Sequence, residues 1–168
     1  MLNPILSRWR LFALVAALAM LAIAHAFERF GGYAPCALCL RQREAYWVAA
    51  GVAVAALVLS RAPGAKVWRP LGLAALALVF LAGAAIAAFH AGVEWKFWPG
   101  PTTCAGASGG VSADDMAALL AGAKVKAPAC DQPAWIFAGL SMAGWNALAS
   151  LGLAILSLAA LLRERARP

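Results

Sequence analysis

The sequence predicts an all-α membrane protein, a four-transmembrane-helix bundle whose long second outer loop carries a short surface helix. Hydrophobic side chains make up 64% of the 168 residues, and charged side chains only 12%. Soluble domains average about 45–50% apolar and about 25% charged residues. These proportions exclude a disordered chain, a collagen and a typical soluble enzyme. The length fits a single integral membrane domain over residues 1–168.

Four apolar runs supply the spans, which we expect over residues of about 11–27, 35–60, 71–90 and 134–162. A bilayer core of about 30 Å requires about 20 residues of helix, and no alternation with a period of two favours strands. The apolar part of the second run is short by itself. It reaches full length if its helix starts at Pro35, a residue that suits the first helical turn.

The charges predict how the spans are oriented. Four spans place both chain ends on one face, together with the loop between the second and third spans. That face carries eight basic residues against Glu164 alone, whereas the other face carries six basic and six acidic residues. The positive-inside rule makes the first face cytoplasmic, so all four cysteines lie outside. The eight basic residues are Arg8, Arg10, Arg61, Lys66, Arg69, Arg163, Arg165 and Arg167.

Two other interpretations of this charge pattern are less favoured. The net charge of +7 is not concentrated in a basic cluster with interleaved aromatics, so we expect no nucleic-acid binding. Arg8, Arg10 and the Ala24–Ala26 segment resemble a secretory signal with a cleavage site. The apolar run between them is longer than such signals usually have, so we expect it to remain as the first span.

The outer loops are expected at about residues 28–34 and 91–133. In the second loop, Ser112 and Asp115 form a variant of the helix capping box, and apolar residues follow at helical spacing. We therefore expect a short amphipathic helix from Ser112 to about Lys124. It would lie on the membrane surface or in solvent, and the sequence favours neither.

Cys36 and Cys39 form a C-x-x-C motif at the start of the second span. Residues three apart share a helix face, so the two sulfurs can bond or exchange there. The first turn of a helix also favours a thiolate. Arg43 lies one turn beyond Cys39 on that face and can hold an anion beside the thiolate, although an arginine there can also reach for lipid headgroups. We expect Arg41 and Gln42 to point away from this stripe.

Cys104 and Cys130 form a second candidate pair in the long loop. A structural bridge between them would contribute about 3 kcal/mol in the chain-entropy model. The prolines and glycines nearby predict an exposed segment, whose disulfide a partner's thiolate can reach. Structural and redox roles both stay open on this reasoning. We expect no metal, because the second pair lacks the close spacing of a four-cysteine zinc site.

Several polar residues lie within the spans or near their ends. His25 and His90 lie at similar depth and could ligate haem, or simply make interfacial hydrogen bonds. His90 or the nearby Glu94 could also assist proton uptake by a bound redox cofactor. We expect Asn146 to make a hydrogen bond between helices.

Longer motifs surround both cysteine pairs. Residues 35–43 read PCALCLRQR, residues 89–95 read FHAGVEW, and residues 98–104 read WPGPTTC. In span number, topology and cysteine framework, nearly the whole chain resembles the DsbB disulfide bond formation family. These proteins belong to the DsbA–DsbB–quinone route that oxidises the bacterial periplasm.

The resemblance implies a role for each cysteine. Cys104–Cys130 would be the disulfide presented to a reduced, periplasmic, DsbA-like protein of thioredoxin fold, and Cys104 would form the mixed disulfide. Electrons would pass to Cys36–Cys39 through a bond between Cys130 and Cys36. Cys39 would then donate to a membrane quinone.

The resemblance also implies the cofactor, the partners and the location. The acceptor would be ubiquinone or menaquinone, with Arg43, Cys39 and His90 as candidate binding residues. The partners would be the DsbA-like protein, the quinone and the lipid bilayer. The protein would lie in the bacterial inner membrane, with both termini cytoplasmic and the cysteines facing the periplasm.

Three alternatives remain. The first is a non-enzymatic four-helix membrane protein with structural disulfides, which would resist mild reductants. The second is an enzyme similar to vitamin K epoxide reductase, which also couples thiols to a quinone. The position of the C-x-x-C motif at the second span favours DsbB instead. The third is a haem protein that uses His25 and His90, which an optical spectrum would reveal.

Overall fold

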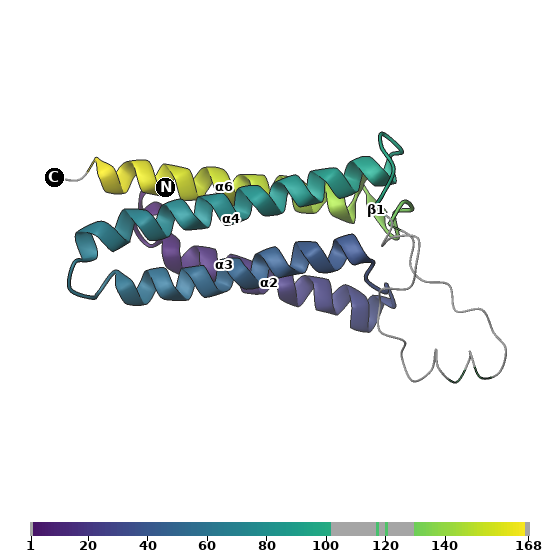
Figure 1. Ribbon diagram of the computed structural model, residues 1–168, viewed down its shortest axis with the longest axis horizontal. Helices are drawn as coiled ribbons and strands as arrows, with labels where there is room; N and C mark the ends of the chain where they lie inside the picture. Colours follow the sequence, from purple (N-terminus) through teal and green to yellow (C-terminus); the bar gives the residue numbers. More distant parts are fainter. Residues whose placement is uncertain (1, 102–116, 118–119, 121–129, 167–168) are drawn as a thin grey trace.

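Four long helices lie side by side in a bundle (Figure 1). The computed structural model describes residues 2–101, 117, 120 and 130–166. The four helices are α2 (Trp9–Gly31), α3 (Ala37–Leu59), α4 (Ala65–Glu94) and α6 (Met142–Arg165), and a short α1 (Leu2–Ser7) precedes them. Helix α4 packs against both α3 and α6, while α2 packs mainly on α3.

The predicted all-helical architecture is confirmed in its main features. Within the described part of the chain, α2, α4 and α6 are long and apolar enough to cross a membrane. Helix α3 has the same 23-residue length as α2. Helix α3 is not among the three helices that are apolar enough to cross a membrane. Its first two turns contain the charged residues Arg41, Arg43 and Glu44. The count of four spans therefore stays a prediction.

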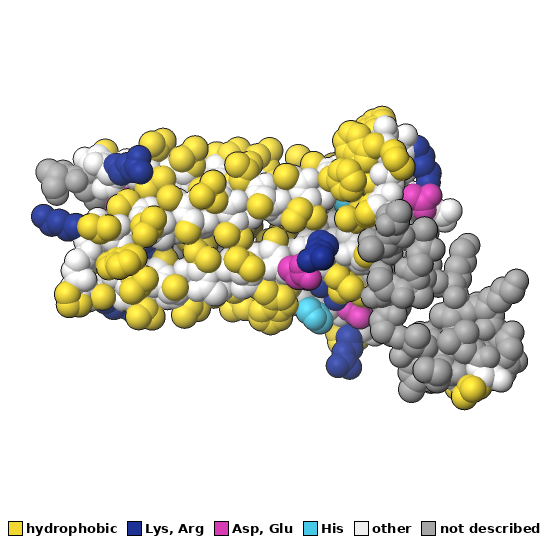
Figure 2. All heavy atoms as spheres, viewed as in Figure 1, with side chains coloured by type: hydrophobic (Ala, Val, Ile, Leu, Met, Phe, Trp, Pro, Cys, Tyr) yellow, Lys and Arg dark blue, Asp and Glu magenta, His cyan; other side chains and the backbone are white. Residues whose placement is uncertain are grey.

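The interior of the bundle is built from small side chains. Ala13 and Ala17 of α2 and Ala49 and Ala53 of α3 are fully or almost fully buried. Small residues let membrane helices approach closely. Many of the large aliphatic side chains of α2, α3, α4 and α6 point outward, and hydrophobic side chains cover the sides of the bundle in Figure 2. An apolar surface of this extent suits contact with lipid.

Several helices begin or end elsewhere than expected. Helix α4 starts at Ala65, six residues before the apolar run, and continues through Pro70. Helices α2 and α4 also run on to Gly31 and Glu94. The apolar run marks only the part of a helix that suits lipid. Polar residues can extend the same helix beyond it, so these helices are longer than the predicted spans, whose own bounds stay predictions.

The start of the last helix differs most. We expected it near Ala134, but α6 begins at Met142, after a hairpin of β1 (Ile136–Phe137) and β2 (Leu140–Ser141). Ala138 and Gly139 form the turn with φ of 49° and 79°, and left-handed conformations of this kind interrupt a helix. The Ser141 side chain then caps α6 by accepting a hydrogen bond from Gly144 N–H.

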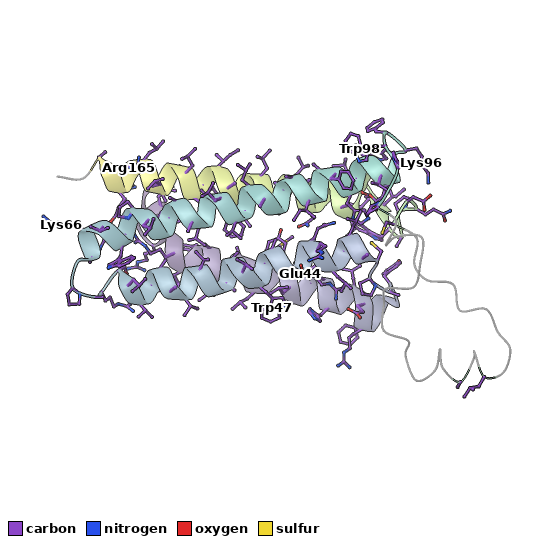
Figure 3. The ribbon with its side chains drawn as sticks, in the orientation of Figure 1. Glu44, Trp47, Lys66, Lys96, Trp98 and Arg165 are labelled. Carbon is purple, nitrogen blue, oxygen red and sulfur yellow. The ribbon has the colours of Figure 1, made fainter. Side chains whose placement is uncertain are left out.

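The helix bundle has two opposite ends, which differ in the segments they contain. The turn at residues 60–64 lies at one end with Lys66 and Arg165, whereas Lys96 and Trp98 lie at the other (Figures 1 and 3). The start of α3, the end of α4 and the hairpin share this second end. Apart from residues 117 and 120, the surface helix expected at residues 112–124 lies outside the described residues, as does Cys104.

Candidate functional site

The C-x-x-C pair forms the first turn of α3. We expected the helix to start at Pro35, but it starts at Ala37, with Cys36 as an extended N-cap whose sulfur accepts a hydrogen bond from Cys39 N–H. A side chain at this position satisfies one of the free N–H groups of the first turn. The two sulfur atoms lie 2.9 Å apart, and both cysteines are free thiols. This arrangement holds the pair ready to form or break a bond.

The surroundings of Cys36 favour its thiolate. Cys36 precedes the first residue of α3 and lies well before the apolar part of that helix. The hydrogen bond between the two thiols lowers the pKa of Cys36 most. Burial opposes this shift, while the nearby His90 ring lowers the pKa of Cys36 further. The net effect lowers the pKa of Cys36, so this thiol ionises more readily than an ordinary cysteine thiol.

A chain of hydrogen bonds leads from α6 to Cys36. The Tyr46 hydroxyl donates to Asn146 Oδ1 at 2.6 Å, and Asn146 Nδ2 donates to Gln42 Oε1 at 2.5 Å. Gln42 Nε2 lies 2.7 Å from His90 Nδ1. An amide nitrogen can only donate, so Nδ1 accepts and the ring proton sits on Nε2. This Nε2 faces Cys36 Sγ at 3.6 Å.

A buried carboxylate completes this part of the site. Glu94 follows His90 by one turn of α4, and its Oε1 lies 3.8 Å from His90 Nε2. Its side chain is 5% exposed, and Oε2 has no hydrogen-bond partner within the described residues. An acid and a base of this kind, buried side by side, can exchange a proton.

Arg43 is held between two helices. Its guanidinium forms an ion pair with Glu28 of α2 at 2.5 Å and donates to the Ala24 carbonyl oxygen at 3.2 Å. The Arg43 side chain is 15% exposed, so it does not extend freely into the surroundings. Arg41, two residues earlier, is 69% exposed and pairs with Glu44 instead. Only Arg43 of these two lines the cavity described next.

An apolar cavity of about 460 Å³ opens beside the thiols. Its polar wall contains Cys36, Cys39, Gln42, Arg43, His90 and Glu94. Its apolar wall includes Phe27 of α2 and Trp135 ahead of the hairpin, whose rings meet edge to face at 5.4 Å. Mostly apolar cavities of about 300–1,000 Å³ with a few polar groups are typical of sites for small molecules.

The structure brings most of the predicted site residues together. Cys130 is disulfide-bonded and 1% exposed, and it belongs to the same buried cluster as Cys36 and Val93. Cys104 lies outside the described residues. His25 does not line the cavity, and its Nδ1 bonds to the Leu21 carbonyl of its own helix at 2.7 Å. Nothing in this geometry pairs His25 with His90.

Gln42 is the residue that sequence reasoning misplaced. We expected it to point away, but it is 7% exposed and bonds to His90. Cys39, Gln42 and Tyr46 are spaced three and four residues apart, which places them on one helix face. That spacing was the available signal. The hydrogen bonds predicted between helices for Asn146 are confirmed.

Replacing Gln42 by leucine tests the orienting role of this chain. Gln42→Leu removes the donor that fixes the proton on His90 Nε2, so Cys36 loses a favourable partner. We expect the pKa of Cys36 to rise, and its alkylation at about pH 6 to slow. The rate of alkylation of the reduced protein as a function of pH measures this shift.

Ser150→Ala is the matched control, because it removes another Tyr46 partner at 2.8 Å and leaves the bonds from Asn146 to His90 in place. This variant should titrate like the parent protein. If Gln42→Leu also titrates like the parent protein, the amide does not act through His90.

Comparison with known proteins places the chain in a family. The family model "Disulfide bond formation protein DsbB" matches residues 7–160, which is most of the chain and includes Cys36, Cys39, Cys104 and Cys130. No curated protein and no solved structure matches the chain. The resemblance seen in the motifs around the cysteines is thereby confirmed. The chain belongs to the DsbB family of disulfide-forming membrane oxidoreductases.

Proposed function

We propose that this protein reoxidises a periplasmic DsbA-like protein of thioredoxin fold and passes the electrons to ubiquinone or menaquinone. One observation carries the proposal. The free thiols of Cys36 and Cys39 lie between an apolar cavity and the disulfide-bonded Cys130. The Cys36–Cys39 dithiol therefore lies next to Cys130 on one side and lines a cavity that suits an apolar electron acceptor on the other.

The proposed orientation adds α3 as the fourth span. Helix α3 lies alongside three helices that suit a membrane, and its residues from Ala45 to Leu59 are free of charge. Its charged first turns would sit at the outer boundary, where arginine tolerates the membrane best. The basic end of the bundle would face the cytoplasm of a bacterial inner membrane. Both termini would then be cytoplasmic and the cysteines periplasmic.

The first steps are thiol–disulfide exchanges. A thiolate of the reduced partner attacks Cys104, the Cys104–Cys130 bond breaks, and a mixed disulfide forms while Cys130 leaves as a thiolate. The partner's second thiol then displaces Cys104 and leaves the partner oxidised. Cys130 attacks Cys36 of an oxidised Cys36–Cys39 pair, and Cys39 is released as a thiolate. Cys104 then attacks Cys130 of the new bond, which restores Cys104–Cys130 and releases Cys36 as the second thiolate of the pair. The contact of Cys130 with the cluster around Cys36 supports the exchange between these two residues.

The cavity residues fit a quinone. The walls of Phe27 and Trp135 suit an apolar ring, and Arg43 and His90 present donors to its oxygens. When bound, a quinone accepts two electrons and two protons from a dithiol. Arg43 would stabilise negative charge beside Cys39. His90 would hold a proton at Nε2, within reach of Glu94.

Two alternatives lose support. A pair of purely structural disulfides does not explain free thiols whose sulfurs lie 2.9 Å apart beside a cavity. An enzyme similar to vitamin K epoxide reductase would use the same chemistry, but the family match favours DsbB.

Turnover by purified protein tests the proposal directly. The protein, a reduced thioredoxin-like dithiol protein and quinone are mixed anaerobically, and quinone absorbance is followed. We expect one quinone to be reduced for each partner dithiol oxidised. Cys39→Ser should reduce this rate to the background, because a serine hydroxyl cannot form or receive a disulfide.

Membrane insertion should be unchanged in Cys39→Ser, and size-exclusion chromatography of the solubilised protein verifies this. Cys39→Ser protein that still reduces quinone at the parent rate would show that the proposed electron path is wrong.

Arg43 provides a second test, which separates cofactor binding from structural support. Arg43→Ala should raise the KM for quinone about tenfold, which corresponds to about 1.4 kcal/mol, because a fixed cation at the cavity is lost. Steady-state kinetics at several quinone concentrations measures this. Arg41→Ala is the matched control, since Arg41 is exposed and does not line the cavity.

Glu28→Gln breaks the ion pair and retains the Arg43 cation. Its KM should stay within about twofold of the parent value. A KM raised equally in Glu28→Gln and Arg43→Ala would assign Arg43 to helix packing alone.

A further inference from the structure

The reduced thiol pair is part of a cluster of metal-binding atoms. Cys36 Sγ, Cys39 Sγ and His90 Nε2 all lie within 4.8 Å of one another. The two sulfurs are 2.9 Å apart, and Cys36 Sγ is 3.6 Å from His90 Nε2. Two thiolates and one imidazole are a frequent ligand set for Zn²⁺ in proteins.

Glu94 lies beside this cluster, outside the group of atoms within 4.8 Å, and becomes the fourth ligand if its side chain rotates toward the sulfurs. Its Oε1 lies 3.8 Å from His90 Nε2, and its side chain is 5% exposed. Its Oε2 has no hydrogen-bond partner within the described residues. Burial of a carboxylate oxygen without a partner is costly, so this orphan atom indicates a ligand.

We propose that the reduced protein binds one Zn²⁺ ion between Cys36, Cys39, His90 and Glu94, and that the bound ion locks the dithiol. The set differs from the four-cysteine site that we rejected, because it uses one cysteine pair with two residues of α4. The binding does not depend on quinone or on a partner. Only its consequence for turnover rests on the proposed function.

The geometry requires small movements. Zn–S bonds of about 2.3 Å and Zn–N bonds of about 2.0 Å place tetrahedral ligands about 3.3–3.8 Å apart. The separation of Cys36 and His90 already falls in this range. The two sulfurs must separate by about 1 Å, which a change of side-chain rotamer supplies.

Binding of the ion changes the protonation and the charge of the site. Both sulfurs bind as thiolates: Cys36 already favours that form, and Cys39 gives up its proton to water when the ion binds. Two thiolates and a carboxylate exceed the charge of the ion by one. The Arg43 guanidinium lies on the same cavity wall but is already paired with Glu28, so the occupied site carries one net negative charge.

His90 must also change its tautomer. Zinc at Nε2 leaves the ring proton on Nδ1, which then needs an acceptor. Rotation of the Gln42 amide presents its oxygen in place of the nitrogen that now lies 2.7 Å away. Asn146 can rotate in the same way, because its amide also carries both a donor and an acceptor.

Occupied thiols cannot form a disulfide or donate electrons. The class of ligand is therefore a thiophilic divalent cation, and its effect is inhibition of the reduced enzyme. Chelation of the ion restores the free dithiol.

A titration of the full chain tests the site. In Cys104→Ala/Cys130→Ala protein, only Cys36 and Cys39 remain as thiols. This protein is reduced, freed of reductant and titrated anaerobically with Co²⁺ as a spectroscopic probe and with Zn²⁺ against a chelating dye. We expect thiolate-to-cobalt absorption bands, one ion per chain and release of the Cys39 proton. Oxidation of the pair should abolish binding.

Matched variants identify the two ligands from α4. His90→Ala and Glu94→Gln should each weaken Zn²⁺ binding by at least about tenfold. The controls are His25→Ala and Glu44→Gln, which replace the same residue types outside the cluster and should bind as the parent does.

Binding that persists in the oxidised protein or is unaffected in His90→Ala would overturn the proposal, as would the absence of cobalt bands. None of these readouts involves quinone or a partner. Failure of the metal site would therefore leave the proposed electron transfer standing.

Discussion

The contact between the first turn of α3 and the last turns of α4 determines the chemistry of this protein. It sets Cys36 Sγ at 3.6 Å from His90 Nε2, with Glu94 one turn further along α4. Cys36 caps α3 and also meets the disulfide-bonded Cys130. If α4 ended with its predicted span at residue 90, Glu94 would have no fixed position beside His90. The extension of α4 beyond that span therefore completes the site.

The packing of the bundle supports this contact. Small side chains between the helices allow close approach, and the polar groups that remain inside bond to one another. Trp9 Nε1 donates to Ser157 Oγ at 2.8 Å, and Tyr46 bonds to both Asn146 and Ser150. The last of these networks continues to His90 through Gln42. Interhelical hydrogen bonds thus fix the helices and orient a reactive ring at the same time.

The sequence predicted the parts of this structure that depend on local pattern. Apolar runs located the helices, and spacing placed Cys39 and Arg43 on one side of α3, where both line the cavity. The starts of α4 at Ala65 and of α6 at Met142 were not predicted. An apolar run indicates which residues suit contact with lipid, and it does not indicate where the helix begins. The partners of Gln42 lie 48 and 104 residues away. Only the fold brings such residues together, so the polar network was beyond prediction.

Cys130 and Cys36 share one buried cluster, and the proposed function requires them to exchange bonds, which would join the disulfide of Cys130 to the thiols at the cavity. Cys39→Ser/Cys104→Ser protein retains only these two cysteines. Mild oxidation of this protein, followed by mass spectrometry of its peptides, measures whether they bond. We predict an intramolecular Cys36–Cys130 disulfide in most molecules. Two cysteines that remain free thiols, or that bond only between chains, would contradict the account.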